Sequence, residues 1–257
     1  MNVTALRYFR GKKILFSTKS EWGSIILASA VGIISPLPTY AAIPIGLSFM
    51  AAGIPFSAVI AFIISSPLMN PTVFFLTATQ IGMEMAIVRT VTAYILGILG
   101  GVLIMKVFKS LSPPKKASIT GQNTPRRKLY VDIYKNTIYV GKYFSLAILL
   151  SAAVKALIPP EAVRSLLGNN AKIGTLIAIG MGVPFYSCGG AAIPFIETLM
   201  ELGMSKGATL AFFIAGPATK LETLYSYKSL LGTKVLVFYL VLTLTFSYIA
   251  GMVYSLF

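Results

Sequence analysis

Three long apolar segments constrain the fold of this chain most. They cover residues 86–106, 133–157 and 233–257, and each has the roughly 20 residues that a helix needs to cross a bilayer. Only 11% of the residues are charged, against about 25% in an ordinary soluble domain. The chain therefore has too little polar surface to cover so apolar a core, and we predict an all-α polytopic membrane protein.

The remaining apolar stretches are shorter and interrupted. Most contain only about 10–13 residues, which corresponds to about 15–20 Å of helix. Such segments are too short to cross alone, so the sequence predicts broken helices or re-entrant hairpins. These stretches are residues 23–35, 41–52, 56–66, 72–82, 171–183, 190–202, 207–216 and 221–231.

Basic residues are concentrated in two segments that contain no acid, residues 1–20 and 106–130. A net charge of +15 would suggest nucleic-acid binding in a soluble protein. Here both basic segments adjoin an apolar segment, which is typical of the cytoplasmic flanks of membrane helices. We therefore expect a multi-pass protein of the cytoplasmic (plasma) membrane, with lipid as its surroundings and no nucleic-acid partner.

The segment 107–130 is polar, basic and rich in Pro and Ser, which is typical of a linker. It divides the chain into two apolar parts. The predicted organisation is a basic cytoplasmic tail (1–20), a first repeat (21–106), a basic cytoplasmic linker (107–130), an additional transmembrane helix (131–157) and a second repeat (158–257).

The two parts match each other at a constant offset of 150 residues. From 41/191 to 74/224, 11 of the 34 pairs are identical without a gap. The identical pairs include two prolines and a glycine: Pro44 with Pro194, Pro67 with Pro217, and Gly53 with Gly203. Coincidence of these residues without gaps indicates an internal repeat.

Charge also orients the two repeats. If both basic segments are cytoplasmic, the first repeat crosses the membrane an even number of times. The additional helix then crosses once more, so the second repeat begins on the outer side of the membrane. The loop 228–234 contains two lysines and no acid, whereas its counterpart 78–84 contains only Glu84 as a charge; the first belongs inside and the second outside. We therefore predict inverted-topology repeats, a recurring plan of secondary transporters.

Prolines and glycines interrupt both repeats at matching places. A proline removes a backbone donor and frees a carbonyl, so a break at membrane depth needs protein or a wet cavity around it. Two interpretations stay open, namely ordinary kinks or surface loops, and a midplane site lined by unwound backbone. The candidate gating or break positions are Pro36, Pro38, Pro44, Pro67, Pro71, Pro184, Gly189, Gly190, Pro194 and Pro217.

Three polar side chains near these breaks are candidate substrate contacts. Asn70 and Lys220 occupy the same position in the two repeats, and Glu197 lies one helical turn before Glu201. Ionisable groups at membrane depth usually face a cavity or a partner. The alternatives are that Lys220 lies at the headgroup level and that Glu201 is solvated at a hairpin tip.

The single cysteine lies in the second-half break, in the sequence Tyr186-Ser187-Cys188 followed by two glycines. Thiolates favour soft metal and metalloid centres, and glycines let a ligand approach the backbone closely. We therefore count these three residues as substrate-binding candidates. A buried cysteine can equally be a small apolar side chain.

Some classes of function lack the residues that they need. The chain has no histidine and one cysteine, which excludes zinc sites of the usual Cys/His kind and His-based acid–base catalysis. It also lacks the nucleotide-binding pattern GxxxxGK[ST]. We expect no enzymatic activity and no cofactor, and the sequence leaves open whether a metal binds.

The sequence PFYSCGGAAIPF, followed by GMSKGATLAFFIAGPAT, resembles a large family of predicted permeases that includes the organoarsenical efflux permeases. A weaker copy in the first half reads AAIP and then AGIPFSAVIAFIISSPLMNP. The resemblance covers about residues 30–106 and 170–255. It implies export of a small solute across the cytoplasmic membrane, with trivalent organoarsenicals as the substrate class of some members.

The expected function is a membrane permease that exports a small solute by alternating access at the repeat interface. A trivalent arsenical or another soft metalloid is the candidate substrate, because of Cys188 and the family resemblance. The alternative function is a non-transporting membrane scaffold or assembly factor. That alternative predicts no solvent-accessible path at Cys188.

Overall fold

The structure, a computed structural model, describes residues 20–35, 37, 39–107, 159–168, 171–182 and 192–256, with single positions at 145, 149, 152 and 156. Every regular element within these residues is helical, so the all-α prediction is confirmed for the described part of the chain. The expected basic tail, most of the linker and most of the additional helix 131–157 lie outside it.

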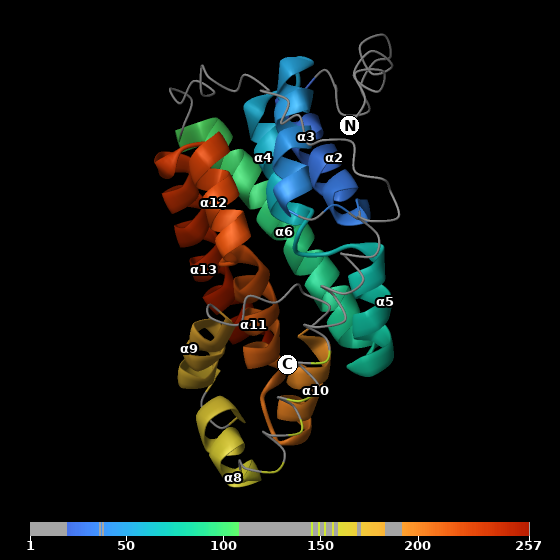
Figure 1. Cartoon of the computed structure of the whole chain (residues 1–257), viewed down its shortest axis with the longest axis vertical. Coiled ribbons are helices and arrows are strands. Elements are labelled where there is room, and N and C mark those ends of the chain that lie inside the picture. Colours follow the sequence, from blue (N-terminus) through green and yellow to red (C-terminus); the bar gives the residue numbers. More distant parts are fainter. Residues whose placement is uncertain are drawn as a thin grey trace.

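The described helices fall into two sets, one before and one after the linker in the sequence, coloured blue to green and yellow to red in Figure 1. The first set is α2 (Glu21–Ile34), α3 (Thr39–Ala51), α4 (Phe56–Ser65), α5 (Pro71–Gln80) and α6 (Met83–Val107). The second set is α8 (Pro160–Val163), a π-helical turn η1 (Arg164–Gly168), α9 (Ala171–Gly182), α10 (Ile193–Glu201), α11 (Lys206–Ala218), α12 (Leu221–Leu230) and α13 (Thr233–Tyr254).

The offset of 150 residues recurs in the backbone. Four pairs of helices begin 150 residues apart: α2 with α9, α4 with α11, α5 with α12, and α6 with α13. The glycines with positive φ also form two such pairs, Gly53 with Gly203 (95° and 108°) and Gly82 with Gly232 (136° and 91°). Glycine adopts this left-handed conformation readily because it lacks a Cβ. The two halves therefore share their helix order and their turn chemistry.

Within the described residues, α6 and α13 are the two helices that are long and apolar enough to cross a membrane. They contain 25 and 22 residues, or about 38 Å and 33 Å of helix, which exceeds the roughly 30 Å of hydrocarbon. They coincide with the predicted spans 86–106 and 233–257. The third predicted span, 133–157, lies almost entirely outside the described residues.

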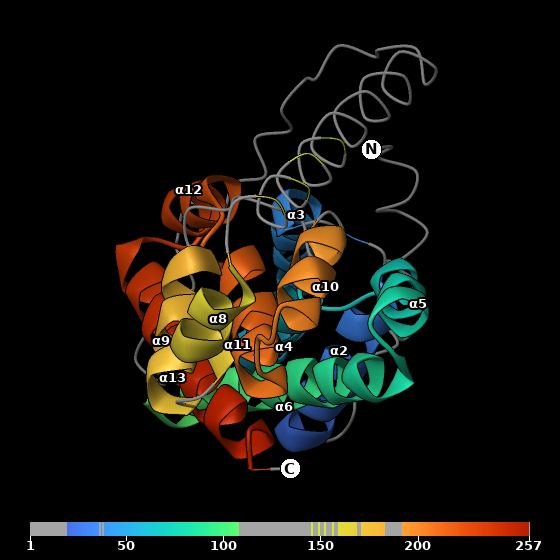
Figure 2. The ribbon, with the colours of Figure 1, turned by 90° about the horizontal axis from the view of Figure 1, so that it is seen from below.

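The helices α4 and α11 form the interior of the bundle. The helix α4 packs against α2 and α6, and α11 packs in the same way against α9 and α13, as the end-on view in Figure 2 also shows. Both are buried around their whole circumference, as expected of helices that are apolar on all sides.

Close backbone approach inside each half depends on equivalent glycines. A Cβ at Gly101 would lie 2.9 Å from the Ser57 carbonyl oxygen, and one at Gly251 would lie 2.8 Å from a Thr175 methyl carbon. The residue equivalent to Ser57 is Gly207, and its carbonyl oxygen also crowds Gly251. Both α6 and α13 therefore pack on their neighbours through a glycine at the same repeat position.

Polar contacts mark the two ends of the bundle. At one end Ser57, at the start of α4, donates a hydrogen bond of 2.6 Å to Glu21 at the start of α2. At the other end Glu84, at the start of α6, accepts hydrogen bonds from Lys206 (2.8 Å) and from the Tyr254 hydroxyl (2.7 Å). The start of α6 therefore meets the start of α11 and the end of α13.

Two helix pairs connect the halves reciprocally. The helix α3 of the first half contacts α12 of the second, and α10 of the second half contacts α5 of the first. Figure 1 shows α3 and α12 towards one end of the molecule and α10 towards the other. Because α3 and α10 occupy corresponding positions in the repeat, each half places its equivalent helix on the other.

Candidate functional site

The break between α4 and α5 lies where the sequence predicted it. The helix α4 ends at Ser65, Pro67 lies in the following turn, and Pro71 is the first residue of α5. In the second half the prediction is wrong at Pro217, because α11 continues through it to Ala218. This proline removes only the bond to the Phe213 carbonyl, and the helix still closes with Thr219 N bound to Ala215 O at 3.1 Å.

Two further prolines have different places in their helices. Pro44 lies inside α3, so its prediction as a helix break is wrong; one proline costs one backbone bond, and the helix continues past it. Pro194 lies in the first turn of α10, where its missing N–H is tolerated. The other predicted break positions, Pro36, Pro38, Pro184, Gly189 and Gly190, lie outside the described residues.

The break of the second half lies at Thr219 and Lys220, between the end of α11 and the start of α12. Buried hydroxyl groups at or beside the two breaks donate hydrogen bonds to backbone carbonyl groups. Ser66 donates a hydrogen bond to the Leu37 carbonyl at 3.2 Å, and Thr223 donates one to the Pro217 carbonyl at 3.3 Å. Both side chains are fully buried. Protein groups therefore supply partners that a break in hydrocarbon would otherwise lack.

Of the predicted polar contacts, Asn70 has a structural role. Its side-chain oxygen accepts a hydrogen bond of 2.9 Å from Val73 N and caps α5. Lys220 occupies the same position before α12, is half-buried, and makes no side-chain capping bond. Glu197 is half-buried on α10, whereas Glu201 at the end of that helix is exposed.

The thiol candidates lie outside the described residues, which break off after Gly182 and resume at Ala192. Tyr186, Ser187 and Cys188 fall in this interval. A Cβ at Gly182 would lie 3.2 Å from the Gly216 backbone nitrogen, so α9 ends directly against the last turns of α11. Among the described residues there is no cluster of three or more Cys, His, Asp or Glu residues suited to a metal.

Sequence reasoning missed Arg89, which lies in α6 and is only 3% exposed. Its guanidinium donates a hydrogen bond of 2.6 Å to the Thr77 hydroxyl and lies 3.9 Å from the centre of the Phe213 ring. The contact thus joins α5 and α6 of the first half to α11 of the second. A buried arginine in a membrane-spanning helix is costly, and such residues are usually functional.

The second half places two tyrosines at the positions of Thr77 and Arg89. Tyr227 and Tyr239 stack with ring centres 4.1 Å apart and planes 15° apart. Each is 1% exposed, and neither hydroxyl has a hydrogen-bond partner in the described part of the chain. Equivalent places in the repeats therefore hold a buried cation with a hydroxyl in one half and two buried phenols in the other.

The stretch Gly203 to Gly207 matches the GxSxG spacing of hydrolase nucleophiles. In the structure its Ser205 caps α11 by accepting a hydrogen bond of 3.2 Å from Ala208 N. The chain contains no histidine to act as a base. The serine is therefore explained by helix capping.

Comparison with known proteins identifies several relatives. A UPF0718 protein of Methanocaldococcus jannaschii, MJ0584, is 33% identical over 106 residues, which are 41% of this chain and 29% of that protein. The UPF0718 protein YcgR of Bacillus subtilis is 22% identical over 80% of this chain and 72% of its own. The matched region thus spans less than a third of the Methanocaldococcus protein. No solved structure matches the chain significantly.

A protein of Streptococcus mutans, named as a subunit of a two-component membrane permease complex, is 23% identical over 84% of this chain and 74% of its own. The family model ArsP_1, described as a predicted permease, matches residues 8–256. That match covers nearly the whole sequence, including both repeats and the breaks between their helices. The chain therefore belongs to this family of predicted permeases.

Proposed function

We propose that this permease exports a small solute across the cytoplasmic membrane by alternating access between two inverted halves. The observation that carries the proposal is the reciprocal docking of the halves, in which α3 contacts α12 and α10 contacts α5. A solute path between two such halves opens to either side when they change their relative position.

The directions of equivalent helices support the inversion. The start of α4 lies with the start of α2, whereas the start of α11 lies with the start of α6. The end of α13 also meets the start of α6 through Tyr254 and Glu84. These contacts support the proposal that equivalent helices begin at opposite ends of the bundle, which the charges of the stretches 78–84 and 228–234 also favour.

Two contacts between the halves would close the proposed solute path, one towards each end of the bundle. The first is the contact of Arg89 with Phe213, which holds α11 of the second half against α6 of the first. The second is the docking of α3 on α12, the helix that carries Tyr227. We propose that separating one of these contacts while the other stays closed gives the two access states.

The substrate part of the proposal is a soft metalloid, such as a trivalent arsenical, held by Cys188. Soft centres prefer thiolate ligands, and the family resemblance points to the same class. The last described residue before this segment, Gly182, packs against Gly216 of α11. Gly182, which directly precedes the segment, therefore lies against the part of α11 that leads to the α11–α12 break, and we propose the midplane site there. The Streptococcus relative is named as a subunit of a two-component permease complex. We therefore include a second protein component in the proposed transporter.

The test is accumulation of a trivalent methylated arsenical in everted membrane vesicles that contain the full chain. We expect Cys188→Ser to abolish accumulation and Lys220→Met to leave it within twofold, because oxygen is a poor ligand for the soft centre. The reverse pattern would replace the metalloid by an anionic solute. Full activity in both variants would remove these residues from the path.

The scaffold alternative makes a different prediction in the same vesicles. A scaffold accumulates none of a panel of metalloids, anions and thiol-reactive compounds, and Cys188 stays unlabelled by a water-soluble maleimide from either side. A permease requires labelling of Cys188 from at least one side, with protection by its solute.

A further inference from the structure

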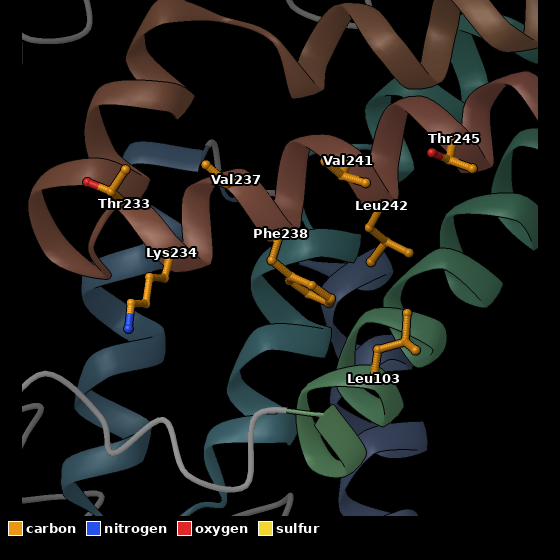
Figure 3. Close-up of a pocket in the computed structure, with 8 residues that line it drawn as sticks. All are labelled: Leu103, Thr233, Lys234, Val237, Phe238, Val241, Leu242 and Thr245. Atoms are coloured by element: carbon orange, nitrogen blue, oxygen red, sulfur yellow. The ribbon is translucent and has the colours of Figure 1, made fainter.

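A groove of about 670 Å³ lies on the outside of the bundle between α13 and the end of α6. The exposed valines on its α13 side, Val237 (53%) and Val241 (61%), belong to a helix long and apolar enough to span the membrane, so they face lipid. The residues that line it are Leu103, Thr233, Lys234, Val237, Phe238, Val241, Leu242 and Thr245 (Figure 3).

The groove has a cation at one end and an apolar floor. Figure 3 shows Lys234, Phe238 and Leu242 projecting from the same side of α13, with Leu103 of α6 facing them. Lys106, in the last turn of α6, lies with its amine 5.9 Å from the centre of the Trp22 ring. Among the described residues, Lys234 is the lysine that lines the groove.

The length of the groove matches one leaflet of a bilayer. Lys234 and Thr245 are 11 residues apart on one helix, which is about 16 Å, or roughly half of the 30 Å hydrocarbon core. Lys234 is the second residue of α13, and Thr245 lies near the middle of that helix. The cation thus lies at the headgroup level and the apolar floor ends near the midplane.

The length of the groove distinguishes a lipid acyl chain from a transmembrane helix as its occupant. A transmembrane helix, from the segment 131–157 or from a second copy of the chain, would follow α13 across the whole membrane. A lipid tail enters from one leaflet and ends at the midplane. The stretch 228–234 also contains Lys228 and Lys234 and no acid, and a lysine near the membrane surface attracts anionic lipid headgroups.

We propose that this groove is a binding site for an anionic glycerophospholipid, with one acyl chain along Phe238 and Leu242 and the phosphate at Lys234. The groove lies on the lipid-facing outside of the bundle, where α13 of the second half meets α6 of the first, and lipid binding there does not depend on the proposed transport. The site would recognise the lipid through the charge of Lys234 at the headgroup level and through the apolar side chains of Phe238 and Leu242, which extend towards the midplane.

The test is native mass spectrometry of the full chain from nanodiscs with equal amounts of phosphatidylglycerol and phosphatidylcholine. We expect wild type to retain phosphatidylglycerol preferentially, and Lys234→Gln to reduce that preference about fivefold, since one lysine near the surface contributes about 1 kcal/mol. Lys228→Gln is the matched control, because Lys228 is exposed in the last turn of α12 but does not line the groove; it should reduce the preference less than twofold.

A second variant tests the floor of the groove. Val241→Trp places a large side chain in it at an exposed position, so the fold should persist while retention of both lipids falls. Equal retention of both lipids by wild type, an unchanged preference in Lys234→Gln, or full retention in Val241→Trp would each overturn the proposal. Retention of no lipid by wild type would instead indicate that protein covers the groove.

Discussion

The hairpins α5–α6 and α12–α13 have the same backbone and different buried side chains. Their helices begin 150 residues apart, and each turn contains a glycine with positive φ, Gly82 or Gly232. Inside the first hairpin Arg89 binds Thr77, whereas inside the second Tyr239 stacks on Tyr227.

Comparing the two hairpins separates the residues that maintain the shared fold from the buried side chains that differ between the halves. The turn glycines Gly82 and Gly232 and the packing glycines Gly101 and Gly251 occupy equivalent positions, because these turns and these close contacts need a residue without a Cβ. The buried pairs occupy equivalent places, yet only the pair in the first hairpin carries a charge. The proposed alternating access needs similar frames in both halves, whereas their contacts with a solute can differ.

Removing the buried charge should have the largest effect. We expect Arg89→Gln to lower solute transport more than tenfold and to lower the free energy of unfolding by about 1–3 kcal/mol, because Thr77 loses its charged partner. Transport in proteoliposomes and denaturant unfolding in detergent measure the two effects.

The matched change in the other half is Tyr239→Phe. The Tyr239 hydroxyl has no partner among the described residues, so its removal should leave stability unchanged or raise it by up to about 1 kcal/mol. A loss of stability as large as that of Arg89→Gln would refute the difference between the hairpins. A loss of transport alone would show that the phenol contacts the solute in another conformation.

The shared glycines should give equal effects in both halves. Gly101→Ala and Gly251→Ala each force a methyl group to within 3 Å of neighbouring atoms, and we expect each to destabilise by about 1–3 kcal/mol. Gly180→Ala in α9 is the control, since nothing lies within 4 Å of its added Cβ; it should stabilise by up to about 1 kcal/mol. Thermal unfolding measures all three, and tolerance at only one of the two packed sites would argue against equivalent packing.

The smallest effect concerns the helix caps. Asn70→Ala should cost about 1 kcal/mol, because Asn70 caps α5 through Val73 N. Lys220→Ala should cost much less, since Lys220 makes no such bond at the start of α12. Denaturant unfolding compares the two variants, and equal losses would show that the capping bond contributes little to stability.

Much of the fold could be predicted from the sequence. The apolar stretches correspond closely to the helices, and the repeat offset reappears in helix starts and in turn glycines, because these turns require glycine. Pro44 and Pro217 were predicted wrongly as breaks because a proline removes a single backbone bond, and the rest of the helix decides whether that matters.

The site was less predictable. Arg89 is one charge in a long apolar segment, and its partner Phe213 is far away in the sequence, so no periodicity connects them. Asn70 was predicted as a substrate contact from its position in the repeat, although an asparagine directly before a helix-starting proline is also typical of a cap. The sequence alone could not rank these two roles.

Inverted topology is the central claim, and two equivalent positions test it directly. Thr79 and Ser229 are both exposed and lie 150 residues apart, near the ends of α5 and α12. We would introduce Thr79→Cys and Ser229→Cys separately in a Cys188→Ser background and label intact and permeabilised cells with a membrane-impermeant maleimide. The account predicts labelling of position 79 in intact cells and of position 229 only after permeabilisation; labelling of both from the same side would contradict it.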